Sequence, residues 1–316
     1  MLLTSCTKQA QPLVVSGFYF DTCVSLTLYE DTEVSRDAAA DFLDRCAAYE
    51  QLFSKNIEGS DIWRINHANG AAVTVSDETA ALLTLAKQYA ARSGGAALPT
   101  IGTVSALWDF HAGTAHIPSK ERIADARNHI DISCLQINGR EVRLTDPDMQ
   151  LDPGFIAKGY IADRLKDDLL ARGIESGIIN LGGNVAVLGE KPDGQAYTVG
   201  IEKPFSHGTP LYTLSVRDTA VVTSGVYERY FYEDTVLYHH ILDPATGFPV
   251  ANDLYSVTIV CKDAAAADAL STACFVLGIQ KGLALIEETD GAEALFLDNE
   301  MNPHPSSGFP KYSIFH

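Results

Sequence analysis

The sequence predicts an α+β fold in which mixed or antiparallel sheets pack against helices. Helical patterns are few and long, and between them lie runs of short, consecutive strand-like segments. Strands that follow one another closely pair antiparallel through short turns, whereas a regular alternation of strand and helix would indicate a parallel sheet. The 316 residues allow one large domain, and the 46% hydrophobic content is enough for a real core.

The first half of the chain contains one strand, two helices and a hairpin. Alternation predicts a strand over GFYFDTCVSLTLY (17–29), and apolar residues at helical spacing predict a helix over 35–53. The segment SDETAALLTLAKQYAARSGG (76–95) is a second helix, because a serine that can act as N-cap opens it and two glycines close it. Short strand-like runs around Asn138-Gly139 predict a hairpin between Ile130 and Leu151.

The second half alternates two helices with several strands. A helix is predicted over 158–173 and a last long helix over 263–278, before KGLALIEE. The predicted strands are 176–183, 197–204, 212–225, 236–244, 254–261 and a final short pair around 292–299 and Tyr312.

Charge limits the partners. The formal net charge of -18 and the pI near 4.8 disfavour nucleic acid, because both surfaces are negative. To bind an anionic ligand, the protein would need a local source of positive charge, such as a helix N-terminus, a few Lys or Arg, or a divalent cation. There is no uninterrupted run of about 18 apolar residues, so no transmembrane helix is predicted.

The N-terminus, MLLTSCTKQ, has the order of a bacterial lipobox in Leu3, Thr4, Ser5 and Cys6, although the charged region and most of the apolar region of a signal peptide are missing. One interpretation is a trimmed lipoprotein anchored through Cys6 outside the cytoplasm, and the other is a frayed terminus with a chance cysteine. We adopt the first, with residues 1–16 as a tether and 17–316 as a single domain. The six cysteines lack metal-ligand spacing and are predicted to be mostly buried free thiols.

Five motifs contain residues suited to chemistry. In DPGFIAKGYIAD (152–163), a turn at Asp152-Pro153-Gly154 precedes a helix, so the N–H groups from about Phe155 to Gly159 could cradle an anion beside Lys158. The alternative is a plain helix start with a solvated lysine. In INLGGNVAVLG and AVVTSGVYERYF, glycines and hydroxyls follow strands and could approach a ligand closely or simply form turns.

The other two motifs offer a base and metal ligands. In HHILDPATG (239–247), alternation allows only one histidine to face a site, and a structural histidine is the alternative. In DAAAADALSTACFVLG (263–278), Asp268 and Thr272 are four apart and share one helix face. Their oxygens suit Mg²⁺, although an amphipathic core helix would look similar.

The order of these motifs resembles the ApbE family of FAD:protein FMN transferases, which carry D-x-G-G-I-A-K-G-Y-A-x-D, N-x-G-G-N, T-S-G-x-Y-E-R, H-I-x-D-P-x-T-G and D-A-L-S-T-A. The resemblance covers roughly residues 18–298 and includes Asn66, Thr100, Gly102 and Trp108 upstream. It implies an ApbE-like fold related to the T-fold, with a ligand cleft between two subdomains.

The resemblance also implies FAD as substrate and Mg²⁺ as cofactor, with FMN transferred to a Thr or Ser hydroxyl of an acceptor protein and AMP released. The metal ligands would be the Ala157 carbonyl, Asp268 and Thr272, and the hydroxyl proton would go to His240 or Asp268. The residues expected to contact FAD are Asn66, Thr100, Lys158, Gly182, Gly183, Asn184, Thr223, Ser224, Gly225, Tyr227 and His240.

The sequence departs from the family pattern at three places. Phe155 replaces a glycine, Leu98 replaces an aspartate, and Phe20-Asp21-Thr22 stands where M-G-T is usual. Two alternatives to the transferase are open. The same site could use water as the nucleophile and act as an FAD pyrophosphatase that yields FMN and AMP, and the changes at Phe155 and Leu98 leave open a non-catalytic FAD-binding lipoprotein.

Overall fold

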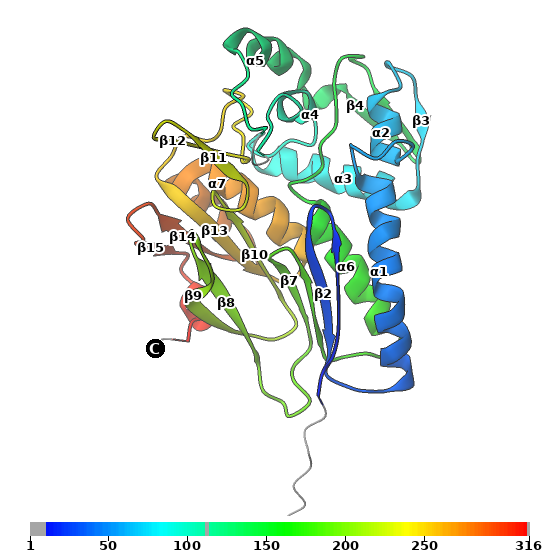
Figure 1. Ribbon diagram of the computed structural model, residues 1–316, viewed down its shortest axis with the longest axis vertical. Helices are drawn as coiled ribbons and strands as arrows, with labels where there is room; N and C mark the ends of the chain where they lie inside the picture. The colour runs from blue at the N-terminus through cyan, green and yellow to red at the C-terminus, as the bar shows by residue number, and fades with distance from the viewer. Residues whose placement is uncertain (1–10, 111–113, 315–316) are drawn as a thin grey trace, which may run out of the picture.

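An eight-stranded antiparallel sheet forms the centre of the molecule (Figure 1). The computed structural model describes residues 11–110 and 114–314. Along the sheet the order is β1-β2-β6-β7-β10-β13-β14-β15, and every pairing is antiparallel. The strands are β1 Leu13–Tyr19, β2 Thr22–Leu28, β6 Gly177–Leu181, β7 Asn184–Leu188, β10 Ala220–Gly225, β13 Leu254–Cys261, β14 Glu293–Asp298 and β15 Pro303–Pro305.

Helices cover one face of this sheet. They are α1 (Glu33–Phe53), α6 (Ala157–Ala171) and α7 (Ala264–Glu287). Because side chains alternate along a strand, Ala186 of β7 joins the core under the helices, while its neighbour Val187 joins the core on the opposite face. That second core is closed by a hairpin made of β8 (Tyr197–Lys203) and β9 (Ser206–Val216).

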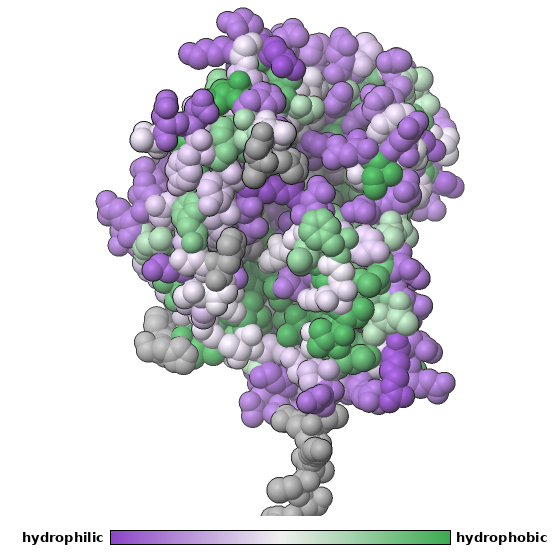
Figure 2. All heavy atoms as spheres, in the orientation of Figure 1, coloured by the Kyte–Doolittle hydropathy of each residue, from purple (hydrophilic) through white to green (hydrophobic). Residues whose placement is uncertain are grey.

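A smaller part of the molecule lies at one end of the central sheet, at the top of Figure 1. It has its own small cores, one around Ile62 and Leu83 and one around Trp108. Its elements are α2 Asp61–Asn66, β3 Val73–Thr74, α3 Asp77–Arg92, α4 Gly102–Ser105, α5 Lys120–Ala126, η1 Arg127–His129, η2 Ile132–Cys134, β4 Leu135–Asn138 and β5 Glu141–Leu144. Figure 2 shows the surface hollowed between the two parts, with hydrophilic residues around the hollow.

Two short elements complete the described fold. The hairpin of β11 (Tyr230–Glu233) and β12 (Val236–His239) follows β10, and η3 (Phe309–Lys311) ends the described chain. The hairpin touches the smaller part of the molecule, because Phe231 and Tyr238 pack in the cluster around Trp108.

The predicted α+β class is confirmed, and most predicted elements form. The single strand over 17–29 was wrong, because the chain reverses at Phe20 and Asp21, whose φ angles of 56° and 57° make a tight turn between β1 and β2. The usual Asn-Gly signal is missing there. β1 begins at Leu13, inside the range assigned to the tether, while Cys6 lies outside the described residues. The five described cysteines are free, and three of them, Cys46, Cys261 and Cys274, are buried as expected, whereas Cys23 is exposed.

The last helix is longer than predicted. It continues past Gly278, where a φ of 75° marks a kink, and includes all but the last residue of KGLALIEE. The final short strand lies at Pro303–Pro305 rather than around Tyr312, which follows η3. By length and composition α7 could cross a membrane, which the sequence prediction overlooked. Its contacts with β10, β13 and α6 make it a core helix, and this explains its apolar composition.

Candidate functional site

The start of α6 lies directly against the first turns of α7. The Gly159 N–H donates to Oδ2 of Asp268 at 2.8 Å. A Cβ on Gly159 would overlap the Ala264 carbonyl and lie 2.7 Å from the Cβ of Asp268, so only glycine permits this approach. The glycine of the A-K-G sequence therefore serves helix contact rather than flexibility.

Asp163 fixes the same two helices. Its two carboxylate oxygens accept from the N–H groups of Ala264 and Ala265, each at 2.8 Å. The N-cap residue of α7, Asp263, makes no side-chain capping bond, so the cap comes from α6 instead. Burial raises the pKa of Asp163 to about 6, although the two N–H groups lower it.

Hydroxyl groups from β10 and α7 meet beside Asp268. Ser224 hydrogen-bonds with Ser271 at 2.7 Å and with Thr272 at 3.2 Å between their side-chain oxygens. Ser271 Oγ also donates to the Asp268 carbonyl. Asp268 and Thr272 lie four residues apart within α7 and so share one helix face, as predicted, and Ser224 at the end of β10 contacts Thr272.

Asp268 is a buried carboxylate that has little compensation for its charge. Burial raises its pKa, and Lys158, the Gly159 N–H and Asn184 oppose the shift. Asn184 Nδ2 is close enough to act on Asp268, yet it is buried without a partner in hydrogen-bonding geometry among the described residues. A cation bound by Asp268 would offset the cost of burying it, so the residues present fit a hard divalent ion.

Lys158 carries the positive charge of the site. It is half-buried and has no hydrogen bond or ion pair within the part of the chain that the structure describes. The predicted cradle of free N–H groups is largely occupied, because Ile156 and Ala157 donate to the Pro153 carbonyl and Gly159 donates to Asp268. An anionic ligand at this place would therefore be bound mainly by the Lys158 ammonium and not by free backbone N–H groups.

The two histidines diverge, as the alternation predicted. His239 is buried; its Nε2 donates to the Val250 carbonyl, and burial lowers its pKa to about 4. His240 Nδ1 is buried without a partner among the described residues. Burial, aided by Arg229, His239 and Lys158, lowers the pKa of His240 to about 3. Its ring is therefore neutral at physiological pH and has one nitrogen unused by the protein.

Other predicted contact residues are engaged within the protein. Asn66 binds the backbone N–H and carbonyl of Leu151, and Thr100 donates to the Ile130 carbonyl. Thr223 bonds Thr258, and the Tyr227 ring is buried beside Gly225. Gly182 and Gly183, with φ of 62° and 92°, form the turn between β6 and β7, with Gly182 against Thr22. Their predicted contacts with FAD stay predictions.

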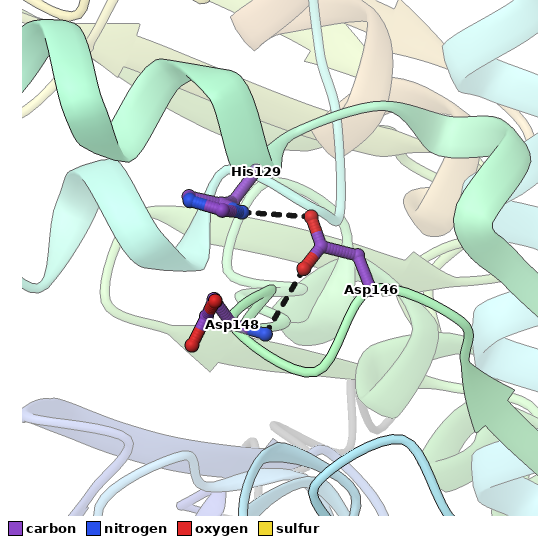
Figure 3. A group of neighbouring side chains, drawn as sticks. All are labelled: His129, Asp146 and Asp148. Carbon is purple, nitrogen blue, oxygen red and sulfur yellow. Dashed lines mark hydrogen bonds and ion pairs between the residues drawn. The ribbon is translucent and has the colours of Figure 1, made fainter.

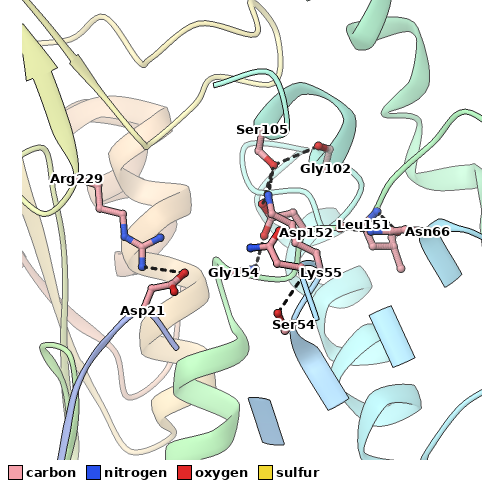
Figure 4. A network of polar contacts seen from close by, with 11 residues as sticks. Asp21, Ser54, Lys55, Asn66, Gly102, Ser105, Leu151, Asp152, Gly154 and Arg229 are labelled. Atoms are coloured by element: carbon pink, nitrogen blue, oxygen red, sulfur yellow. Dashed lines mark hydrogen bonds and ion pairs between the residues drawn. The ribbon is translucent and has the colours of Figure 1, made fainter. Parts of the chain in front are cut away.

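A polar network that the sequence did not reveal surrounds the loop just before α6 (Figure 4). Lys55 Nζ lies 2.6 Å from Asp152 Oδ2, and Ser105 Oγ donates to the same oxygen at 2.7 Å. Burial would raise the pKa of Asp152, but Lys55, Ser105 and the Gly154 N–H together lower it to about 2. The motif's first aspartate thus fixes the loop before α6. Lys55 is distant in sequence, and nothing in its local pattern pointed to this pairing.

A second group of potential metal ligands shares no residue with this site. His129, Asp146 and Asp148 have ligand atoms within 4.8 Å of one another. His129 Nδ1 lies 2.8 Å from Asp146, and the Asp148 N–H binds the other oxygen of Asp146 (Figure 3). Their mutual bonds account for the grouping, so we place no function there.

The comparisons with known proteins identify the family. The model of the ApbE family matches residues 20–296. The chain belongs to the ApbE family. A FAD:protein FMN transferase of Treponema pallidum is 38% identical over 278 residues, covering 82% of this chain and 76% of the relative. One of Klebsiella pneumoniae is 37% identical over 278 residues, covering 87% of this chain and 85% of the relative.

Solved ApbE structures confirm the fold. The ApbE protein of Thermotoga maritima superposes with a TM-score of 0.89 at 31% identity, covering 96% of this chain and 100% of that one. The flavin transferase ApbE of Vibrio cholerae gives 0.86 at 26% identity, covering 96% and 99%.

Proposed function

We propose that this protein is a FAD:protein FMN transferase. It takes FAD as substrate and transfers FMN to a Thr or Ser hydroxyl of an acceptor protein. The main structural support for this reaction is the junction of α6 and α7. There Asp268 accepts a hydrogen bond from the Gly159 N–H beside Lys158, which is half-buried and has no ion-pair partner among the described residues. Family membership and relatives that are FAD:protein FMN transferases support the same reaction.

Mg²⁺ is the proposed cofactor. The Ala157 carbonyl, Asp268 and Thr272 would hold it, since all three offer oxygen and lie at the start of α6 or on one face of α7. When bound, the ion neutralises charge on the diphosphate. The buried carboxylate of raised pKa and the unsatisfied amide of Asn184 support a cation here.

The protein groups position the substrate and accept a proton. The acceptor oxygen forms a bond to the FMN-side phosphorus, the bond from that phosphorus to the bridging oxygen breaks, and AMP leaves with that oxygen. We assign the hydroxyl proton to His240, because its Nδ1 is buried without a partner and its low pKa keeps it neutral. The nearby diphosphate would raise that pKa and strengthen the base.

We also propose that Cys6 carries a lipid and anchors the domain to the cell membrane outside the cytoplasm, on the periplasmic side or at the cell surface. The order Leu3-Thr4-Ser5-Cys6 supports this. Fractionation of cells that express the full-length precursor should place the protein with membranes, and Cys6→Ala should release it. A protein that stays with the membranes after this change would contradict the anchor.

The test of the function measures both products. The protein is incubated with FAD, Mg²⁺ and a candidate acceptor; AMP is followed by chromatography and bound flavin by fluorescence after SDS gels. Asp268→Ala should abolish both, while Asp263→Ala, on an exposed residue of the same helix start, should preserve them. AMP without a labelled acceptor would indicate an FAD pyrophosphatase. Intact FAD would indicate a carrier and overturn the transferase proposal.

A further inference from the structure

We propose that Arg229 is a second cationic ligand for the diphosphate of the substrate and that Asp21 competes with the substrate for it. This inference rests on the proposed function, because it names a further residue of the same site. Neither residue belongs to the set predicted from the motifs to contact metal or FAD.

Arg229 is held beside His240 by the backbone. The His240 N–H donates to the Arg229 carbonyl at 3.1 Å, and the adjacent residues Tyr230 and His239 are paired across the β11–β12 hairpin. The charges of Arg229 and Lys158 both lower the pKa of His240, so both cations are near this ring. An anion placed between them would meet two positive groups and one neutral imidazole.

The guanidinium of Arg229 is available for a ligand. Its side chain is 48% exposed, and among the described residues its one ion pair is with Asp21, at 4.0 Å between Nη2 and Oδ2. It makes no side-chain hydrogen bond within the described part of the chain. Figure 4 shows the guanidinium directed at Asp21 and separate from the group of Lys55 and Asp152.

Asp21 lies at the tip of the β1–β2 hairpin. Its φ of 57° is in the left-handed region that favours glycine, and Asp tolerates this region better than most other residues. The tip is anchored because the Phe20 N–H donates to Glu50 Oε1 at 2.6 Å and Thr22 packs against Gly182. The turn therefore holds the Asp21 side chain in a defined place, 4.0 Å from the Arg229 guanidinium.

The ion pair between Arg229 and Asp21 is weak enough for a phosphate group to replace Asp21. An ion pair of this length between side chains that are 48% and 68% exposed is weak. A phosphate can receive two parallel hydrogen bonds from an arginine, so it binds more strongly than a carboxylate at 4.0 Å. Asp21 still opposes an incoming diphosphate by like charge, and its effect should appear as a lower affinity for FAD.

The test is a double-mutant cycle on FAD binding in the presence of Mg²⁺, measured by quenching of flavin fluorescence. Arg229→Gln should weaken binding about 10- to 100-fold, because a charge-assisted bond is lost. Asp21→Asn should tighten binding about 2- to 5-fold. In the Arg229→Gln background, Asp21→Asn should have a smaller effect on FAD affinity, because the guanidinium for which Asp21 and the diphosphate compete is gone.

A matched control comes from another exposed pair. Arg217 and Glu190 lie 2.9 Å apart, with side chains 55% and 51% exposed, so Arg217→Gln removes the same charge elsewhere and should leave FAD affinity unchanged. Circular dichroism checks that each variant is folded, and Arg229→Lys provides a second variant that should retain part of the affinity.

The outcomes separate this inference from the proposed function. If the unaltered protein binds FAD but Arg229→Gln binds within twofold of it, Arg229 is no ligand and only this inference fails. The same holds if Asp21→Asn weakens binding. If the unaltered protein does not bind FAD with Mg²⁺ at all, the proposed function fails and this inference with it.

Discussion

The N–H of Gly159 points at the carboxylate of Asp268, 2.8 Å from Oδ2, and thereby joins the start of α6 to the first turns of α7. The bond orients one carboxylate oxygen toward the backbone and leaves the other for a ligand. It also requires that the two helices approach more closely than a side chain at 159 would allow. Charge and shape at the site therefore depend on the same glycine.

Gly159→Ala should destabilise the protein and weaken Mg²⁺ binding. Alanine normally favours a helix over glycine by about 1 kcal/mol, but here its Cβ would overlap the Ala264 carbonyl. We expect a net loss of about 2 kcal/mol or more in the free energy of unfolding, measured by urea denaturation, together with lower metal affinity by calorimetry.

Gly173→Ala is the control for this substitution. Gly173 follows α6 with a φ of 80° and open space around its Cβ position, so it should cost about 1 kcal/mol through backbone strain alone and leave the metal affinity unchanged. Equal metal affinities in the two variants would contradict the role of the close contact.

Much of this arrangement was predictable from the sequence, because the relevant signals are local. The spacing of Asp268 and Thr272 places them on one helix face, and the glycine pair at 182 and 183 gives a tight turn after a buried strand. Hydrophobic periodicity likewise predicted α1 and α6, whose buried residues recur at helical spacing. The N-cap serine and the closing glycines predicted α3.

What the sequence could not show depends on contacts between distant residues. Asp163 was part of a recognised motif, but its cap on α7 joins positions about a hundred residues apart. Lys55 meets Asp152 only because the smaller part of the molecule folds over the start of α6. The predicted N–H cradle was occupied for a local reason: the Pro153 carbonyl accepts the first N–H groups of the turn.

The Lys55–Asp152 pair yields a stability prediction. Lys55→Met leaves the Asp152 carboxylate without its main compensating charge, and breaking a buried pair in this way typically costs about 3–5 kcal/mol. Because Asp152 is 23% exposed at its side chain, we expect the lower end of that range. The double variant Lys55→Met with Asp152→Asn should recover part of the loss, because no unpaired charge remains.

Urea denaturation at pH 7 measures this effect. Arg36→Met removes half of an exposed pair with Asp31 and should change the free energy of unfolding little. If Lys55→Met proves as mild as Arg36→Met, the pair does not stabilise the loop before α6.

The Asp163 cap can be tested apart from chemistry. Asp163→Ala leaves the N–H groups of Ala264 and Ala265 without acceptors and should lower the free energy of unfolding by about 1–2 kcal/mol. Asp163→Asn keeps one acceptor oxygen and should lose less. Asp263→Ala, at the N-cap position itself, should have little effect since its side chain makes no capping bond. A larger loss from Asp263→Ala than from Asp163→Ala would contradict the assignment.

The pH dependence of stability should reflect His239, His240 and Asp163 together between about pH 6 and 5. The folded pKa values of the histidines are about 4 and about 3, below the usual value of 6.5, so the unfolded chain binds more protons and acidification destabilises the fold. Asp163 has a folded pKa of about 6 against its usual value of 3.8, so the folded chain binds more protons and acidification stabilises it.

Each fully effective group changes the free energy of unfolding by about 1.4 kcal/mol per pH unit. The two histidines together should outweigh Asp163 by about 1 kcal/mol from pH 6 to pH 5, and Asp268, whose pKa is raised by burial, acts in the same direction as Asp163. Asp163→Asn removes the opposing group and should steepen the loss, whereas His239→Gln should flatten it. Urea denaturation at both pH values measures all three slopes, and an unchanged slope in His239→Gln would mean that this ring is not held neutral by burial.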